Sequence, residues 1–423
     1  MKHSTKSVDL LVMTWHQVYM SAKAGGYVRL REFLKRMPKE IKYIVMDNPP
    51  SLYADILPQK NIVIFETPKF LKQLEKKLFV VWIFLETIFA GIVVYQTGKK
   101  LIENLSPKVI YVPIGEFPQL YIPAILLKRK YPHVRLVVDI LNYELPEKNV
   151  WLFYKRLRNS GSGLFRTIAI ISAFYIGYFL TNRTINNVDY VFTVSKKLVL
   201  ALKKVYKKTT IDYTPSGVNL PLSKRVVEKK KFLGIYVGRM SSVKGVFEIL
   251  NVWAKVVEQN KTAQLALVGF VDENTLGALK KQIEFNLKKN VSIFTHVSDQ
   301  KKNELLSQSE LFLHLAKYEP LFPVIGILEG FSFGLPVVIY NMEVYQSVRK
   351  QFKLTDTSIY AVKNSDTNAA AKAVTDFARL SQSKKKEASL NVIKIAKLFS
   401  WDSIAQKEFR VINSLIKQQK IYD

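Results

Sequence analysis

Two cations stand on a short, glycine-bounded turn in the middle of the chain. Arg239 and Lys244 lie in the run Gly-Arg-Met-Ser-Ser-Val-Lys-Gly, 238–245, directly after an apolar segment, 232–237, that is typical of a strand. Fixed positive charge on a turn that opens a helix suits a diphosphate, because the helix N-terminus adds free backbone N–H groups and a favourable dipole. Alone, the pair fits two solvated surface cations equally well.

Two glutamates further along the chain strengthen the interpretation. Glu319 stands in a loop after an apolar run, and Glu329 stands in an otherwise apolar helix that leads into another strand. A carboxylate at such a helix face can accept hydrogen bonds from both hydroxyls of a ribose, and a second carboxylate can hold sugar hydroxyls. An unpaired charge in an apolar helix is costly, so Glu329 is poorly explained as an ordinary surface residue.

A histidine near the N-terminus is a third candidate. His16 follows the apolar run 8–14, so a strand would present it at the end of a sheet, where it could approach an acceptor hydroxyl. A lone histidine at such a place is more often a structural hydrogen-bonding residue. Both interpretations stay open.

Alternating strands and helices would position these residues. Short apolar runs separated by longer amphipathic segments are typical of parallel sheets, which bind ligands at the carboxyl ends of their strands. The alternation stops at a charged link, 222–231, and then restarts, so two such domains are predicted, with the chemistry in the cleft between them. The expected strands are 8–14, 43–46, 61–65, 109–113, 134–139 and 190–194 before the link, and 232–237, 265–268, 291–294, 311–315 and 336–339 after it.

Length and composition agree with this organisation. At 423 residues the chain exceeds the usual limit of a single core, so two domains of about 200 residues are expected. Hydrophobic residues make up 48% and charged residues 23%, which excludes a disordered chain and a polytopic membrane protein. The chain has no cysteine, which excludes disulfides, thiolate nucleophiles and cysteine-bound zinc. The polar N-terminus has no signal-peptide core, so a cytoplasmic location is expected.

The charge balance predicts affinity for polyanions. Lys and Arg total 64 against 34 Asp and Glu, a formal charge of +30, which fits nucleic acid, anionic lipid or phosphorylated ligands. Two apolar stretches, 78–95 and 168–180, are interpreted as buried or surface-docking helices, with a membrane-spanning helix as the alternative. The first contains Glu86, and the second is too short to span about 30 Å of hydrocarbon.

A basic amphipathic helix is expected after Gly25 and Gly26. It could rest on anionic lipid, each cation near the surface contributing about 1 kcal/mol. An ordinary solvated face of a basic protein fits equally well. The apolar positions are Leu30, Phe33, Leu34, Met37 and Ile41, and the basic stripe is Arg31, Lys35, Lys39 and Lys42.

Several motifs together resemble glycosyltransferase family 4, the retaining enzymes of the GT-B fold among the glycosyl transferases group 1. The resemblance covers nearly the whole chain and is strongest from 189 to 338. Its motifs are 189–195 (Asp-Tyr-Val-Phe-Thr-Val-Ser), 215–219 (Pro-Ser-Gly-Val-Asn), Gly238-Arg239 with Lys244-Gly245, 267–269 (Leu-Val-Gly), 329–338 (Glu-Gly-Phe-Ser-Phe-Gly-Leu-Pro-Val-Val) and 399–401 (Phe-Ser-Trp).

That resemblance implies an α/β fold of the GT-B class, with two Rossmann-like domains facing each other across a cleft. Residues 1–221 would form an acceptor-binding domain with membrane-docking segments, and residues 222–398 a nucleotide-sugar-binding domain. Residues 399–423 would form a helix that returns to the first domain.

The resemblance also implies roles for the charged residues. Arg239 and Lys244 would bind the donor diphosphate, Glu329 the ribose and Glu319 the transferred sugar. The family normally places seven residues between its two glutamates, whereas nine separate them here, and Leu321 stands eight positions before Glu329. Either the loop holds a two-residue insertion or Glu319 has lost its role.

Further roles would fall in the N-terminal half. The turn at Gly25 and Gly26 would offer backbone N–H groups to a phosphate of the donor or acceptor. The family often carries a catalytic Asp or His just after a strand of this domain, and Asp139 is the candidate here, with His16 as the other possibility.

The resulting hypothesis is a retaining, metal-independent hexosyltransferase bound peripherally to the inner face of the cell membrane. A nucleoside diphosphate leaves with growing negative charge, so fixed cations lower the barrier, and no metal or other cofactor is expected. The donor would be a UDP- or GDP-sugar and the acceptor a lipid-linked sugar or glycolipid at an anionic membrane surface. The chain has no Asp-x-Asp pair, no phosphate-binding Gly-x-x-x-x-Gly-Lys-Ser/Thr and no His-Glu-x-x-His.

Two alternatives come from other functional classes. A nucleic-acid-binding protein fits the charge and the 12% aromatic content, but no binding fingerprint is present and nucleic acid is not the expected partner. A catalytically inactive GT-B partner subunit fits the irregular glutamate spacing. Salt-sensitive RNA binding without donor binding would favour the first, and donor binding without turnover the second. A hydrolase with two opposed carboxylates finds no other support.

Overall fold

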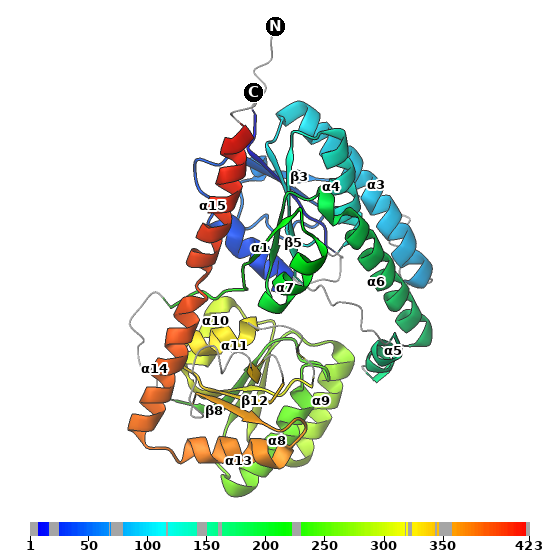
Figure 1. Ribbon diagram of the computed structural model, residues 1–423. Coiled ribbons are helices and arrows are strands. Elements are labelled where there is room, and N and C mark those ends of the chain that lie inside the picture. The colour runs from blue at the N-terminus through cyan, green and yellow to red at the C-terminus, as the bar shows by residue number, and fades with distance from the viewer. Residues whose placement is uncertain are drawn as a thin grey trace. The chain divides into compact units, whose positions relative to one another are not determined.

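Two α/β units, each built around a parallel sheet, make up the chain in the computed structural model (Figure 1). Unit 1 comprises residues 1–215 and 402–423, and unit 2 comprises residues 216–401. Leu321 and most of the charged link, 222–229, lie outside the described residues. The structure describes residues 7–16, 25–66, 68, 79–115, 117–141, 150–159, 163–221, 230–317, 319, 324–342, 345–346 and 358–419.

The sheet of unit 1 has the strand order β3-β2-β1-β4-β5-β6-β7, and all its pairs are parallel. Its strands are β1 (Leu10–Met13), β2 (Tyr43–Asp47), β3 (Ile62–Ile64), β4 (Val109–Val112), β5 (Arg135–Ile140), β6 (Tyr190–Thr193) and β7 (Thr210–Tyr213). Its helices are α1 (Gly25–Lys35), α3 (Phe79–Leu105), α4 (Pro118–Lys130), α5 (Val150–Asn159), α6 (Leu164–Thr184), α7 (Lys196–Val205) and α15 (Trp401–Gln419), with short 3-10 turns at Gln59–Asn61 and Ile185–Asn187.

The sheet of unit 2 has the order β10-β9-β8-β11-β12-β13 and is also parallel throughout. Its strands are β8 (Phe232–Val237), β9 (Leu265–Gly269), β10 (Val291–Thr295), β11 (Ser309–His314), β12 (Val337–Tyr340) and β13 (Ile359–Val362). Its helices are α8 (Val246–Gln259), α9 (Glu273–Asn286), α10 (Asp299–Ser307), α11 (Ile325–Ser332), α13 (Thr367–Ala378) and α14 (Gln382–Leu398).

Helices cover both faces of each sheet. In unit 1, Leu10 and Val12 pack with α1 and α15, whereas Leu11 and Met13 pack with α3, α4 and α7. In unit 2, one core holds residues of α8, α9 and α13, and the other holds residues of α10, α11 and α14. Successive strand side chains therefore enter opposite cores, which is why the strands are almost continuously apolar in sequence.

The expected α/β fold with two parallel sheets is confirmed. Every expected strand is present, and the two additional strands, β7 and β13, lie at sheet edges. Each is four residues long and carries polar or half-buried side chains, so its sequence lacks the apolar signal of a central strand. In both sheets the strand order reverses beside the first strand, and the carboxyl ends of the strands there are the usual ligand-binding positions.

Two of the motifs that carried the family resemblance meet in space. Val218 forms a parallel bridge with Ser400, and its backbone N–H donates to the Phe399 carbonyl at 2.8 Å. The Trp401 N–H donates in turn to the Val218 carbonyl at 3.1 Å. The turn at 215–219 and the motif 399–401 thus pair where the chain enters and leaves unit 2.

The apolar stretches form α3 and α6, which lie side by side in unit 1 (Figure 1). Among the residues that the structure describes, no helix has both the length and the apolar character needed to cross a bilayer.

The basic helix after Gly25 is shorter than expected. α1 ends at Lys35, so Met37, Ile41, Lys39 and Lys42 follow it rather than continue it. Pro38 explains the end, because proline disfavours helical backbone at the preceding residue. The predicted basic stripe therefore does not run along one helix.

Candidate functional site

The carboxyl ends of β8 and β11 form the switch point of the unit 2 sheet. The two strands are neighbours, and β8 leads into the turn that carries Arg239 and Lys244. Gly245 ends this turn at φ 75° and caps α8. A Cβ at that position would lie 1.9 Å from the Leu315 carbonyl oxygen, so only glycine lets the N-terminus of α8 approach the segment after β11.

The turns after β8 and β9 also depend on close backbone packing. A Cβ at Gly269 would lie 1.9 Å from the Gly238 carbonyl oxygen, and the Gly238 N–H donates to the Val268 carbonyl at 3.0 Å. The motifs 238–245 and 267–269 are thus in direct backbone contact. The glycines of these motifs allow the close packing that fixes the turn with Arg239 and Lys244.

Lys244, Glu319 and His314 form a polar cluster at this edge of the sheet. The Lys244 Nζ donates to both carboxylate oxygens of Glu319, at 3.1 and 2.8 Å. The His314 Nε2 lies 3.2 Å from Glu319 Oε2. Glu319 is 8% exposed and His314 4%, whereas Lys244 is 27% exposed. The carboxylate is therefore held between a cation on the α8 turn and an imidazole at the end of β11.

The charge state of Glu319 follows from these contacts. Burial raises the pKa of its carboxyl, but the hydrogen bond with His314 and the charge of Lys244 outweigh burial. The pKa of Glu319 therefore lies below its usual value, and the residue is a carboxylate at neutral pH.

Arg239 differs from Lys244 in its surroundings. Its side chain is exposed, and its backbone carbonyl accepts a hydrogen bond of 2.8 Å from the Tyr236 hydroxyl. Tyr236 thus fixes the backbone of the turn while the guanidinium faces solvent. An exposed arginine beside a half-buried lysine can contact two oxygens of one diphosphate.

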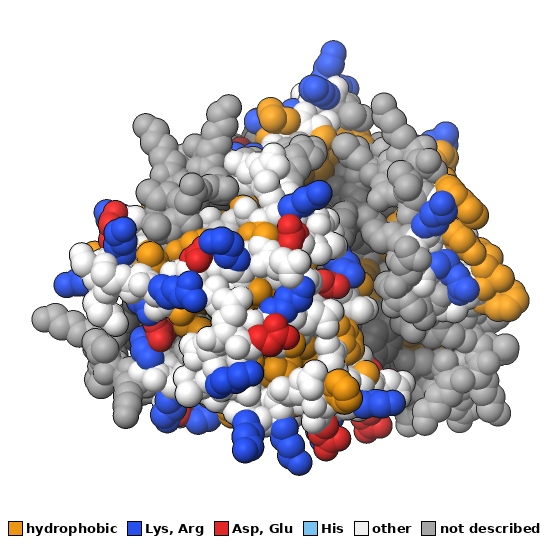
Figure 2. Space-filling model, turned by 90° about the horizontal axis from the view of Figure 1, so that it is seen from below, with side chains coloured by type: hydrophobic (Ala, Val, Ile, Leu, Met, Phe, Trp, Pro, Cys, Tyr) orange, Lys and Arg blue, Asp and Glu red, His pale blue; other side chains and the backbone are white. Residues whose placement is uncertain are grey.

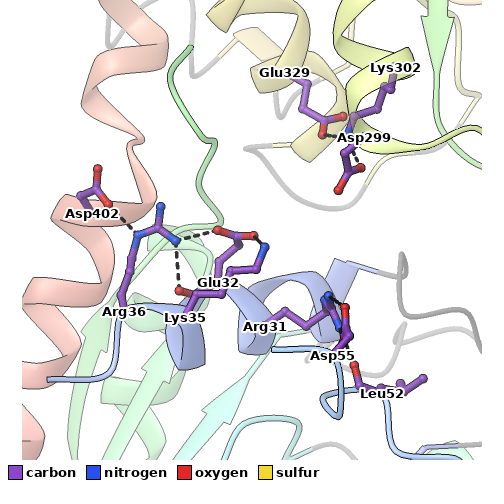
Figure 3. A network of polar contacts seen from close by, with 10 residues as sticks. All are labelled: Arg31, Glu32, Lys35, Arg36, Leu52, Asp55, Asp299, Lys302, Glu329 and Asp402. Atoms are coloured by element: carbon purple, nitrogen blue, oxygen red, sulfur yellow. Dashed lines mark hydrogen bonds and ion pairs between the residues drawn. The ribbon is translucent and has the colours of Figure 1, made fainter. Parts of the chain in front are cut away.

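Glu329 has a charged partner that the sequence did not indicate. The Lys302 Nζ, on α10, lies 2.5 Å from Glu329 Oε1 and 3.3 Å from Asp299 Oδ1 (Figure 3). Burial lowers the pKa of Lys302, but the two carboxylates outweigh it, so the pKa is raised and the lysine stays charged. This ion pair satisfies Glu329 within its apolar helix and leaves one carboxylate oxygen for a ligand hydroxyl.

His16 lies in unit 1, at the end of the sheet as expected, and is 2% exposed. Its Nδ1 lies 3.2 Å from Asp47 Oδ1 at the end of β2, and its backbone exchanges two hydrogen bonds of 2.8 Å with the Asn48 side chain. Its Nε2 has no hydrogen-bond partner among the described residues. The ring is thus oriented by Asp47, and the catalytic role of His16 stays a prediction.

Asp139 lies in a buried network of unit 1. Its Oδ2 accepts hydrogen bonds from Arg29 Nε at 3.0 Å and from the Tyr111 hydroxyl at 2.9 Å, and its side chain has no exposed surface. Arg29 also pairs with Glu408 of α15 and donates to the Thr214 hydroxyl at 2.8 Å. These contacts give Asp139 a structural role as an anchor of α1. They do not favour the predicted catalytic role.

Two cations of the expected lipid-binding stripe, Arg31 and Lys35, are paired with carboxylates, as is the neighbouring Arg36. Arg31 donates to both carboxylate oxygens of Asp55, at 2.7 and 2.6 Å, and Lys35 contacts Glu32 at 2.8 Å (Figure 3). Arg36 lies 2.6 Å from both Glu32 and Asp402. Partner carboxylates therefore offset the charge of Arg31, Lys35 and Arg36, and lipid binding by this segment stays a prediction.

The glycine turn stands where the sequence placed it. Gly25 and Gly26 are the first residues of α1, so their backbone N–H groups lack partners within the helix. A Cβ at Gly26 would lie 3.1 Å from a methyl group of Leu141. The residues just before Gly25 are outside the described ranges, and phosphate binding at this turn stays a prediction.

Sequence reasoning missed His314, Lys302, Asp47 and Arg29. Each is a charged or polar residue beside apolar runs, which is the signal that identified Glu329. Arg29, Asp47 and Lys302 have partners far along the chain, for example Arg29 with Asp139 and Glu408, whereas His314 contacts Glu319 across the loop that follows β11. Spacing in a single sequence does not reveal such pairs.

Comparison with known proteins identifies the second unit. Residues 222–396 match the family model of glycosyl transferases group 1. No curated protein sequence matches the chain.

Solved structures match nearly the whole chain. HepE of Anabaena, in complex with UDP and glucose, is 14% identical with a TM-score of 0.66, over 96% of this chain and 100% of HepE. Sucrose-phosphate synthase of Thermosynechococcus elongatus is 15% identical with a TM-score of 0.67, over 97% and 100% of the two chains. The N-terminal domain of Candida albicans trehalose-6-phosphate phosphatase is 13% identical with a TM-score of 0.65, over 98% of each chain. Most of unit 2 therefore matches the family model of glycosyl transferases group 1, and the chain has the GT-B fold of the solved glycosyltransferase structures.

Proposed function

We propose that this protein is a retaining glycosyltransferase that moves a hexose from a UDP-sugar to a lipid-linked sugar or glycolipid. One observation carries the proposal: Lys244, Glu319 and His314 gather at the carboxyl ends of β8 and β11, in a domain that matches glycosyl transferases. The UDP bound in the HepE structure favours uracil over guanine as the donor base.

The chemistry assigned to this site is transfer at the anomeric carbon of the donor. The bond between that carbon and the diphosphate oxygen breaks, and the acceptor hydroxyl oxygen forms the new bond on the same face. The hydroxyl proton passes to the leaving phosphate oxygen. Arg239 and Lys244 stabilise the negative charge that grows on the diphosphate, so this proposal needs no bound metal.

Glu319 and Glu329 bind the two sugars of the donor in this proposal. Glu329 accepts a ribose hydroxyl with the oxygen that Lys302 leaves available, and Glu319 accepts hydroxyls of the transferred hexose. Because Glu319 contacts Lys244, an incoming diphosphate must share that cation. Binding of the diphosphate then loosens Glu319 and makes its carboxylate available to the sugar.

Calorimetric titration of UDP and GDP, without added metal, tests the donor site. We expect UDP to bind wild-type protein and to bind Lys244→Ala about 1.5 to 3 kcal/mol more weakly, because a charge-assisted contact with the diphosphate is lost. Tighter binding of GDP would change the assigned base. Binding of neither nucleotide would contradict the proposal and favour a nucleic-acid-binding role, and UDP binding without sugar transfer would indicate an inactive partner subunit.

His314 is expected to matter for turnover rather than for nucleotide affinity. His314→Phe removes the donor to Glu319, so kcat should fall about tenfold, the value of one hydrogen bond to a charged group, while the Kd for UDP changes less than about twofold. His314→Gln keeps a side-chain N–H and should restore most of kcat. Steady-state kinetics measures both variants. Equal losses in the two would show that the histidine acts by packing alone.

A further inference from the structure

The outer face of α6 carries an apolar stripe that no other described element covers. Phe165 is 77% exposed, Ile168 and Ile176 are each 50% exposed and Phe179 is 51% exposed. Their spacing of three, eight and three residues places them on one side of the helix. Thr167, on the opposite side of the helix, and Ala169, which borders the stripe, are buried, so α6 packs on unit 1 with part of its surface and presents a second apolar face outward.

The neighbouring helix α5 extends this face with an aromatic pair. Trp151 is 59% exposed and stacks on Tyr154 at 5.1 Å between ring centroids. Lys155 lies over the Trp151 ring at 5.5 Å, and Arg183 at the far end of α6 lies over Phe179 at 4.2 Å. Aromatic rings flanked by cations are the residue types that proteins place at the boundary between hydrocarbon and headgroups.

The charge of this segment is entirely positive. From residue 150 to residue 188 the sequence contains no Asp or Glu, and its cations are Lys155, Arg156, Arg158, Arg166 and Arg183. Figure 2 shows hydrophobic side chains with Lys and Arg beside them at its right-hand edge, the side on which Figure 1 draws α3, α5 and α6. The α1 surface, by contrast, pairs its cations with carboxylates.

We propose that this α5–α6 face, residues 150–184, docks on an anionic lipid bilayer. The 21 residues of α6 form a helix about 32 Å long, which would lie in the plane of the interface with its stripe among the acyl chains. Lys155, Arg158 and Arg183 would meet the phosphates of the headgroups. The link to a lipid-borne acceptor rests on the proposed function, but the docking itself requires neither donor nor acceptor.

Trp151 is a built-in reporter of this docking. The chain has five tryptophans, and Trp15, Trp82, Trp253 and Trp401 are at most 4% exposed. Trp151 alone among them is exposed, at 59%. Vesicles of phosphatidylcholine and phosphatidylglycerol with brominated acyl chains should therefore quench only the Trp151 part of the emission. Quenching of Trp151 fluorescence by iodide in solution should decrease when the vesicles are added.

The variant Phe165→Ser/Phe179→Ser should bind the anionic vesicles at least about tenfold more weakly, since two large apolar side chains no longer leave water. Phe285→Ser is the matched control, because Phe285 is 85% exposed on α9 of unit 2 and should not affect vesicle binding. Trp151→Phe should abolish the quenching signal but not co-sedimentation with the vesicles.

Three outcomes would overturn the proposal: no quenching by anionic vesicles, equal binding by the Phe165→Ser/Phe179→Ser variant, or protection of Trp151 from iodide by RNA but not by vesicles. A UDP titration of the same variant separates the two hypotheses. Unchanged UDP affinity with lost vesicle binding supports docking by this face, whereas failure of UDP binding in wild-type protein would count against the proposed function alone.

Discussion

Replacing Glu319 by glutamine should lower turnover about 100-fold and, at the same time, tighten the binding of UDP several-fold. Turnover falls because glutamine has no charge with which to hold the hydroxyls of the transferred hexose. UDP binds more tightly because the Lys244 ammonium, which lies 2.8 Å from Glu319 Oε2, loses the carboxylate that competes with the diphosphate. A variant that binds the nucleotide better and reacts more slowly is not expected from a merely structural residue.

Steady-state kinetics with a UDP-hexose and calorimetry with UDP measure the two effects separately. Glu304→Gln is a suitable control, because Glu304 pairs with Lys301 on the surface of α10 and should leave both quantities unchanged. Full turnover in Glu319→Gln would show that the longer spacing between the two glutamates has removed Glu319 from the reaction. Weaker UDP binding would show that Glu319 does not compete for Lys244.

Replacing Arg29 by methionine should destabilise unit 1 by about 3 to 5 kcal/mol, because removing one partner leaves buried charges uncompensated. Arg29 is 3% exposed and contacts both Asp139 and Glu408, which are themselves buried. Without the guanidinium, two carboxyl groups face each other in the interior. The loss should release α15, since Glu408 ties that helix to α1.

Hydrogen exchange measured by mass spectrometry can follow the two units separately along the same urea gradient. Peptides from unit 1 should lose protection at lower urea in Arg29→Met, while peptides from unit 2 serve as an internal reference. Arg31→Met is the matched control on the same helix. Its partner Asp55 is 65% exposed, so the pair should contribute less than about 1 kcal/mol. Equal effects of the two variants would contradict the assigned role of the buried network.

The same network should make the stability of unit 1 depend on pH. Burial raises the pKa of Asp139 to about 6 and that of Glu408 to about 7. In the unfolded chain both carboxyls ionise near about pH 4, so between about pH 4 and pH 7 the folded unit holds protons that the unfolded chain has lost. The free energy of unfolding should therefore fall as pH rises through this window. Glu408→Gln should flatten that slope in hydrogen-exchange measurements, and an unchanged slope would contradict the prediction.

The candidate residues of unit 1 and those of unit 2 differ in how far the sequence predicts their surroundings. In unit 2, Arg239 and Lys244 stand on one short turn, so their positions relative to each other follow from the local sequence. The glycines that bound the turn are required by its close backbone packing, and their presence in the sequence therefore indicates the shape of the turn. In unit 1, Asp139 was selected by its place after a strand. Its partner Arg29 is far away in sequence, and only the folded structure shows that the carboxylate is buried.

By itself the sequence predicted the two parallel sheets, the positions of their central strands along the chain and the turn that carries Arg239 and Lys244. The alternation of strands and helices, the apolar runs and the glycine-containing turns each depend on neighbouring residues, so the spacing of residues in the sequence is enough to predict them. Only the tertiary structure decided which charges are paired, because spacing in the sequence does not fix side-chain contacts and many of the partners, such as Lys302 and Glu329, lie far apart in the chain. It thereby joined Glu319 to His314, engaged Glu329 with Lys302, paired cations of α1 with carboxylates and left the apolar stripe of α6 facing outward.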